Sequence, residues 1–141
     1  MSTATATRHR LQARLLPAKD AYDYDYFRER LADPALADAG VAITLYRVPL
    51  LAVPVGGERR GGYASFEHLV HAVGVRTLLS VVSGFPRLRI RWSPYPDTCH
   101  TVEWGEPGPP WWADDVTCGR FYGYSSNAIA DFRRGAEQWP R

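Results

Sequence analysis

The chain has 141 residues, of which 45% are hydrophobic and 23% are charged, and its formal net charge is +2. This length excludes more than one ordinary domain and is long enough to bury a single core. No apolar run approaches the roughly 18 residues that a membrane span needs, and the first residues lack the apolar stretch of a secretory signal. We therefore expect a cytoplasmic protein without a membrane partner.

Charge is unevenly distributed along the chain. Residues 1–19 contain four basic side chains and no acid, so they carry +4 and leave −2 on the remainder. Four charges give only weak, salt-sensitive binding to phosphate. We expect a disordered basic arm over residues 1–19, a single α+β domain over 20–135 and a C-terminal tail over 136–141.

The first part of the domain predicts helical segments followed by two strands. Residues 20–31 place acidic side chains first and apolar ones at spacings of about four, which indicates a helix. One more helical turn is expected over 35–39. Residues 41–46 alternate with period two, which predicts a strand. Residues 50–55 are expected to form an edge strand because they contain and follow proline, and the glycine-rich residues 56–62 a mobile loop.

A second long helix is expected over residues 65–83, with Ser65 as its cap. Its core-facing side chains would be Phe66, Leu69, Val70 and Val73. Several valines over 75–82 leave a strand open as the alternative for that stretch. A glycine and a proline follow and would end the helix.

Residues 87–104 predict a β-hairpin. A five-residue loop over 93–97 would pair Trp92 with Thr98 and place Arg87 opposite Glu103 as a cross-strand ion pair. The inward side chains would be Leu88, Ile90, Trp92, His100, Val102 and Trp104.

The remaining residues predict a rigid loop over 105–110, a short strand over 118–122 and a last helix that Ser125 or Ser126 caps. Ile129 and Phe132 would face the core from that helix. The element order is α-β-β-α-β-β-(β)-α. It indicates an α+β fold in which one antiparallel sheet of four to five strands has helices packed on one face.

The outer face of the hairpin is the first candidate binding surface. Arg87, Arg89 and Arg91 share that face and, with Tyr46, could contact an anionic ligand or stack on bases. Glu103 would neutralise part of the charge, and the glycine-aromatic signature of an RNA-recognition sheet is absent. These observations favour a small anionic ligand or a protein partner over nucleic acid.

The adjacent residues Trp111 and Trp112 are the second candidate. They follow two prolines in a loop, and two neighbouring tryptophans in a loop cannot both bury easily. We expect one of them to cover the edge of the core and the other to be exposed. Exposed aromatic side chains mark contacts with partners or ligands.

An enzymatic alternative uses Cys99 or His100 with Asp97 near the hairpin loop. Adjacent strand residues point to opposite faces, which works against a direct pair between the cysteine and the histidine. A zinc site would need four nitrogen or sulfur ligands. The available side chains match no standard zinc spacing, and we expect neither metal nor cofactor; they are His68, His71, Cys99, His100 and Cys118.

The run from Arg91 to Gly105, RWSPYPDTCHTVEWG, and the Tyr122-Gly-Tyr-Ser125 segment before the last helix resemble an uncharacterised family of small Streptomyces proteins. The resemblance extends over residues 20–135. It implies an actinobacterial source, and it implies no activity and no catalytic residue.

The sequence therefore favours a small cytoplasmic binding or regulatory accessory protein. Its partner would be an unidentified protein or a small anionic ligand, held by the arginine face of the hairpin and the tryptophan loop. The alternative is the small enzyme that uses the hairpin loop.

Overall fold

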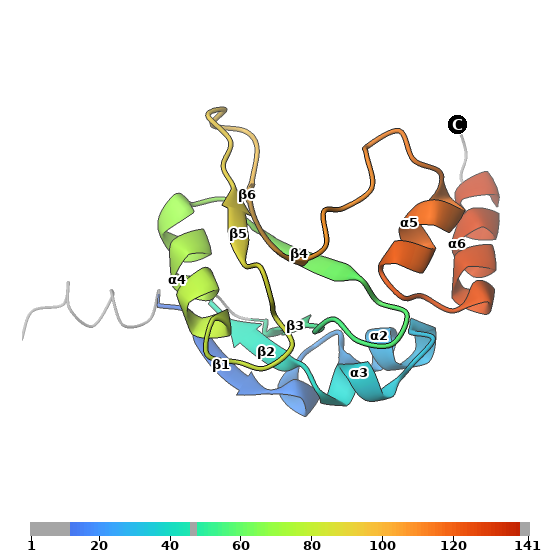
Figure 1. Cartoon of the computed structure of the whole chain (residues 1–141), viewed down its shortest axis with the longest axis horizontal. Coiled ribbons are helices and arrows are strands. Elements are labelled where there is room, and N and C mark those ends of the chain that lie inside the picture. Colours follow the sequence, from blue (N-terminus) through green and yellow to red (C-terminus); the bar gives the residue numbers. More distant parts are fainter. Residues whose placement is uncertain (1–11, 46–47, 139–141) are drawn as a thin grey trace, which may run out of the picture.

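The computed structural model describes residues 12–45 and 48–138. This part of the chain is α+β, as expected, but it holds two small antiparallel sheets in place of one sheet of four to five strands (Figure 1). The first sheet has the order β1-β2-β3, and the second has the order β4-β6-β5. The division into two sheets was not predicted, because strands pair with partners from distant parts of the sequence and local periodicity does not specify those partners.

The first sheet begins inside the segment that was expected to be a disordered arm. Strand β1 (Arg14–Pro17) pairs with β2 (Val41–Thr44), and β3 (Leu50–Ala52) pairs with the other side of β2. The strand prediction for β2 and the edge position of β3 are confirmed. The arm prediction is wrong for β1, because Leu15 and Leu16 of this strand pack into the interior.

Both faces of the first sheet are covered. Ile43 points into a core shared with the second sheet, whereas its neighbour Ala42 points into a core under the first helices. Those helical elements are η1 (Ala18–Asp20), α2 (Tyr24–Arg30) and α3 (Ala35–Asp38). Since successive strand residues face opposite sides, β2 lies between two apolar layers.

The second sheet contains an element that the sequence did not predict. Strand β4 (Gly61–Phe66) occupies the expected loop and helix start, and α4 (Leu69–Leu79) begins only afterwards. Ser65 is no cap, because its hydroxyl lies 3.2 Å from the Thr101 hydroxyl across the sheet. The expected helix face is also wrong: Ala72, Val75 and Leu79 are buried, whereas Leu69, Val70 and Val73 are exposed.

The hairpin is confirmed, with a register two residues away from the expected one. Strand β5 (Arg89–Arg91) pairs with β6 (His100–Gly105) so that Arg89, and not Arg87, lies opposite Glu103. The backbone at Arg87 is left-handed, with φ 55°, so regular pairing begins only after it. A shift of two preserves which side chains share a face, and Val102 and Trp104 are buried as expected.

Trp92 is an exception to the expected inward set. It is 58% exposed and stacks against the His100 ring with a centroid distance of 6.4 Å. The shifted register places these two residues beyond the last paired positions, at the base of the turn.

The last part of the chain is helical. Helix α5 (Asp115–Phe121) occupies the expected short strand, and α6 (Ser126–Gln138) extends into the expected tail. The α5 helix begins where the Thr117 N–H donates to the Asp114 carboxylate at 2.7 Å. Ser125 caps α6 as expected, and Ile129 is buried, but Phe132 is 63% exposed. None of the helices in the described residues is long and apolar enough to span a membrane.

Candidate functional site

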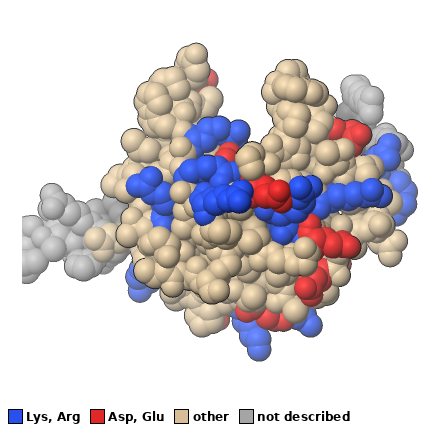
Figure 2. Space-filling view, viewed as in Figure 1, with Lys and Arg blue, Asp and Glu red and all other residues tan. Residues whose placement is uncertain are grey.

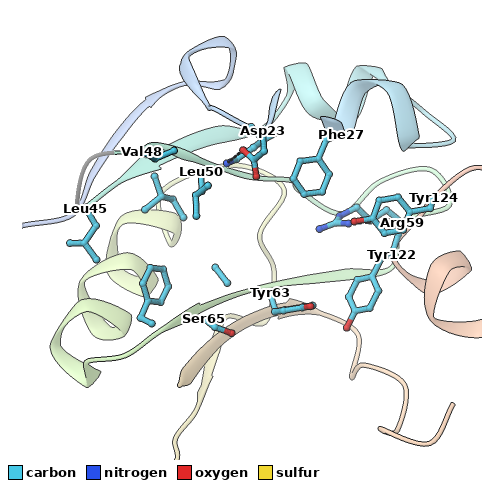
Figure 3. A pocket seen from close by; sticks show the side chains of 14 residues that line it. Asp23, Phe27, Leu45, Val48, Leu50, Arg59, Tyr63, Ser65, Tyr122 and Tyr124 are labelled. Atoms are coloured by element: carbon cyan, nitrogen blue, oxygen red, sulfur yellow. Dashed lines mark hydrogen bonds between the residues drawn. The ribbon is translucent and has the colours of Figure 1, made fainter. Parts of the chain in front are cut away.

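A cleft of about 430 Å³ opens between the edge strands of the two sheets (Figure 3). Its walls are mostly apolar and aromatic, with Phe27, Leu45, Leu50 and Phe66 among them. Arg59, Tyr122 and Tyr124 lie together at one end of the cleft (Figure 3). A charged group in such apolar surroundings is the feature that separates this cleft from an ordinary surface hollow.

A tight turn carries Arg59 into the interior. The backbones of Gly56 and Arg59 bond to each other in both directions, at 2.8 and 3.1 Å. Gly57, within the turn, has φ +50°, a conformation that glycine adopts without strain. The segment expected as a mobile loop is therefore an ordered turn that aims one arginine inward.

The Arg59 guanidinium is buried without a counter-ion. Its residue is 6% exposed, its Nε donates to the Val53 carbonyl at 3.3 Å, and its Nη1 donates to the Tyr122 carbonyl at 2.8 Å. In the described residues no carboxylate lies within 4.0 Å of it. Burial lowers the pKa of Arg59 to about 10, so the group stays charged at neutral pH.

One nitrogen of this guanidinium remains available. Both bonds from Arg59 use Nε and Nη1, which leaves Nη2 without a partner among the described residues. No fully buried polar side-chain atom there lacks a hydrogen bond, so Nη2 retains accessible surface. Arg59 is among the residues that line the cleft, and its guanidinium end lies beside Tyr122 and Tyr124 in the stick view (Figure 3).

Tyrosines surround the guanidinium. The Tyr122 ring centroid lies 5.9 Å from the Arg59 guanidinium carbon and 5.5 Å from the Tyr63 ring. The Tyr124 ring stacks on Phe27 at 6.5 Å. Burial raises the pKa of both Tyr122 and Tyr124. Neutral phenols therefore face the arginine over the whole physiological pH range.

The opposite wall carries a carboxylate that is already engaged. Asp23 lines the cleft, and its Oδ1 accepts a hydrogen bond from the Leu51 N–H at 2.7 Å. This bond satisfies a backbone donor on the open edge of β3. It also explains why Asp23 does not cap α2 with its side chain.

The arginines expected to form a binding face lie elsewhere, on the outer surface of the second sheet. Arg89 and Arg91 both pair with Glu103, at 3.2 and 3.3 Å. Arg89 also donates to the carbonyls of Gly105 and of Arg87. The space-filling view shows blue and red groups intermingled across the molecule (Figure 2). Tyr46, the aromatic residue proposed for the same face, lies outside the described residues.

Trp111 and Trp112 are both exposed, whereas one of them was expected to cover the edge of the core. They are 91% and 71% exposed, and their rings meet edge to face at 5.6 Å. Their loop and the β5–β6 turn form two projections on the same side of the molecule (Figure 1). Neither tryptophan lines the cleft that contains Arg59.

The structure does not bring together the residues of the enzymatic alternative. Cys99 is a free, exposed thiol, and the His100 Nδ1 accepts a hydrogen bond from the Ser93 N–H at 3.1 Å. No hydrogen bond joins Cys99 to His100 or to Asp97 in residues 12–45 and 48–138. The same residues contain no cluster of three or more histidine, cysteine or acidic side chains that could hold a metal.

Comparison with known protein families identifies a match over most of the chain. The profile described as a family of unknown function (DUF6302) matches residues 15–141. The chain belongs to DUF6302. The expected resemblance to an uncharacterised family is thus confirmed at that level, and the match begins within β1. No curated protein and no solved structure matches this DUF6302 member.

Sequence reasoning missed Arg59, the buried charge at one end of the DUF6302 cleft. Arg59 is one of many arginines, and its residue type gives no sign that it is buried. The available signal was the glycine pair on each side of it, because glycine marks places where backbones approach closely. The backbones of Gly62 and Gly123 approach Arg59 in this way, because a Cβ on either glycine would lie 2.5–2.6 Å from an Arg59 atom.

Proposed function

We propose that this DUF6302 protein is a binding protein whose cleft takes a ligand with one anionic group and an apolar body. The observation that supports this proposal is the Arg59 guanidinium, which is buried at one end of an apolar cleft, has no carboxylate beside it and uses only Nε and Nη1 in hydrogen bonds with the described residues.

Physical chemistry favours an anion at this position. A buried charge without a partner is unfavourable, and a ligand carboxylate or phosphate would compensate it in a low-dielectric site. Hydrogen bonds between a guanidinium and an oxyanion are stronger than neutral ones. The apolar walls would remove the ligand's hydrocarbon surface from water at the same time.

Octanoate and its neutral analogue 1-octanol form a matched pair of probes. Calorimetric titration into the full chain is expected to show octanoate binding at least roughly tenfold more tightly, since a hydrogen bond to a charged group contributes about 1.5–3 kcal/mol. Arg59→Met is expected to abolish this preference, and Arg59→Lys to retain part of it.

Arg60→Met is the control variant. Arg60 follows Arg59 directly, but its guanidinium is exposed and pairs with Glu106 at 2.7 Å. Octanoate should bind this variant as it binds the wild type. Equal affinities of the wild type for octanoate and 1-octanol would refute the proposal.

A second contact surface has its own support. The outer hairpin face with Arg87, Arg89 and Arg91 and the loop with Trp111 and Trp112 remain proposed sites for a protein partner or a small anionic ligand or, less favoured, nucleic acid. Trp111 is 91% exposed, and the Arg91 side chain is 73% exposed. Titration with single-stranded oligonucleotide at low salt should quench tryptophan fluorescence if this surface stacks bases. An unchanged emission would remove nucleic acid as its partner.

We further propose that the protein works as an accessory or regulatory factor in the cytoplasm of a Streptomyces or related actinobacterium. The support is the resemblance of residues 91–105 and the composition of the chain. Fractionation of such a cell, followed by immunodetection of the protein, tests the location.

A further inference from the structure

The outer edge of β4 has no strand beside it among the described residues, since β4 pairs only with β6. The hydrogen bonds at the end of β6 show which backbone groups this leaves open. The Glu106 N–H donates to the Arg60 carbonyl at 3.0 Å, whereas the Gly105 N–H donates to the Pro86 carbonyl on the β5 side at 2.8 Å. Alternate residues of β6 therefore bond to opposite neighbours.

The alternation continues along β4. Gly62 and Ala64 fall in the hydrogen-bonded pairs with β6, and Tyr63 and Ser65 fall in the pairs between them. The side chains of Ser65 and Thr101 approach to 3.2 Å, which is typical of a pair that is not hydrogen-bonded. The backbone N–H and C=O groups of Tyr63 and Ser65 consequently point away from β6, toward the cleft.

The facing edge of β3 differs, because a side chain already occupies it. The Leu51 N–H donates to Asp23 at 2.7 Å, and the Pro49 carbonyl accepts from the Tyr22 N–H at 2.8 Å. Among the described residues, β4 therefore offers both donors and acceptors along the cleft, whereas the Leu51 N–H of β3 is already bonded. Tyr63 and Ser65 both line it and are both exposed.

We propose that the natural ligand is the carboxyl-terminal end of an extended peptide, which adds as a strand to the open edge of β4 and places its terminal carboxylate on Arg59. The inference rests on the function proposed above and names its ligand class. Main-chain bonds to a sheet edge supply affinity in this mode of recognition, and pockets for alternate side chains supply specificity.

The direction of the added strand follows from the position of Arg59. Strand β4 begins at Gly61, next to the turn that carries Arg59, and runs away from it. A peptide that ends at Arg59 must therefore run antiparallel to β4. At about 3.3 Å per residue, the span from Gly61 to Phe66 accommodates a segment of roughly five residues. Every second side chain of that segment would face the apolar wall that contains Leu45 and Leu50.

The test uses the probe peptide acetyl-Val-Thr-Val-Leu-Val with a free carboxylate, its C-terminal amide, and two N-methylated isomers. Strand addition requires only alternate peptide N–H groups to bond to β4. One isomer carries N-methyl groups at the odd positions and the other at the even positions. We expect the free acid to bind, the amide to bind roughly tenfold more weakly, and one isomer to lose binding while the other retains it.

A variant of the chain provides the complementary measurement. Ser65→Pro removes an N–H that points away from β6, a position at which a sheet edge tolerates proline. It is expected to weaken binding of the free acid by roughly tenfold. Circular dichroism and the thermal midpoint establish that the variant is folded, and the two N-methyl isomers on the wild type keep the test independent of it.

The outcomes separate this inference from the proposed function. If octanoate binds in an Arg59-dependent way but the peptide does not bind, or both N-methyl isomers bind equally, the peptide inference is overturned and the cleft remains a site for a small anion. If neither octanoate nor the peptide binds the wild type, the proposed function fails and the inference fails with it.

Discussion

The close contacts of Gly62 provide a direct test of how the cleft is built. A Cβ at this position would lie 2.5 Å from Arg59 Nη2 and 2.6 Å from two atoms of the Trp104 indole. Both neighbours would have to move by roughly 1 Å to restore van der Waals contact. Trp104 is 1% exposed, and its indole N–H donates to the Val53 carbonyl at 2.9 Å. The guanidinium, at the end of a flexible side chain, yields more readily, but the indole must shift as well.

Gly62→Ala is expected to lower the free energy of unfolding by about 1–3 kcal/mol, the usual effect of adding a methyl group to a filled interior. It should also weaken octanoate binding, because Arg59 Nη2 leaves its position. Urea unfolding followed by circular dichroism measures the first effect, and calorimetric titration measures the second.

Gly74→Ala is the matched control. Gly74 lies within α4, and a Cβ there would meet no atom within 4 Å. Alanine in a helix interior is more favourable than glycine by about 0.5–1 kcal/mol, so this variant should gain stability and bind octanoate normally. A Gly62→Ala protein as stable as the wild type, with unchanged octanoate affinity, would refute the packing argument.

Three further expectations concern the core, a helix cap and the pH dependence of the site. Leu79→Ala should lower the free energy of unfolding by about 2–5 kcal/mol, because Leu79 is 0% exposed. The control Val81→Ala, at a position that is 86% exposed, should change the free energy of unfolding by less than about 0.5 kcal/mol. Asp114→Ala should destabilise the protein at neutral pH, because the hydrogen bond from the Thr117 N–H lowers the pKa of Asp114 in the folded state. A carboxyl group with a lowered pKa stabilises the folded state at every pH above its pKa in the unfolded chain. In urea titrations the difference in unfolding free energy between Asp114→Ala and the wild type should therefore shrink as the pH falls through the acid range. Octanoate affinity should stay constant near neutral pH and fall as the pH rises past about 10, the pKa of Arg59, and an affinity that falls well below that pH would argue against an arginine anchor.

The local hydrophobic pattern was sufficient to predict an element of the fold where the partners of that element are close in sequence. The hairpin was predictable because Val102 and Trp104 alternate with polar residues and meet β5 across a short turn. Its register was not, because the left-handed backbone at Arg87 delays pairing until Arg89.

Elements that depend on distant partners were missed. Strand β1 has only two apolar residues of its own and is a strand because β2 lies beside it. Strand β4 reads Gly-Gly-Tyr-Ala-Ser-Phe, a composition poor in β-branched residues. It is stabilised by six paired positions on β6, about forty residues further along the chain. The split into two sheets follows from such long-range choices.

The same reason explains why the exposed candidates were found and the buried one was not. Exposure of Trp111 and Trp112 follows from their own loop, which the sequence displays. Burial of Arg59 depends on three separate segments, which contribute Gly62, Trp104 and Gly123. No local pattern reports such a convergence.

Whether Arg59 serves binding or stability is decided by one substitution. Among the described residues its hydrogen-bond acceptors are two backbone carbonyls, and the Val53 carbonyl also accepts from Trp104. Removing one member of a true buried ion pair costs about 3–5 kcal/mol, because a charge is left buried without its partner. Arg59 has no charged partner among the described residues, so its replacement by an apolar side chain of similar volume leaves only the Tyr122 carbonyl without a donor. The free energy of unfolding of Arg59→Met should therefore lie within about 1–2 kcal/mol of the wild-type value, while the variant no longer binds octanoate. A loss of 3–5 kcal/mol would make the guanidinium a structural element, and the cleft would then lose the feature that argues for a ligand.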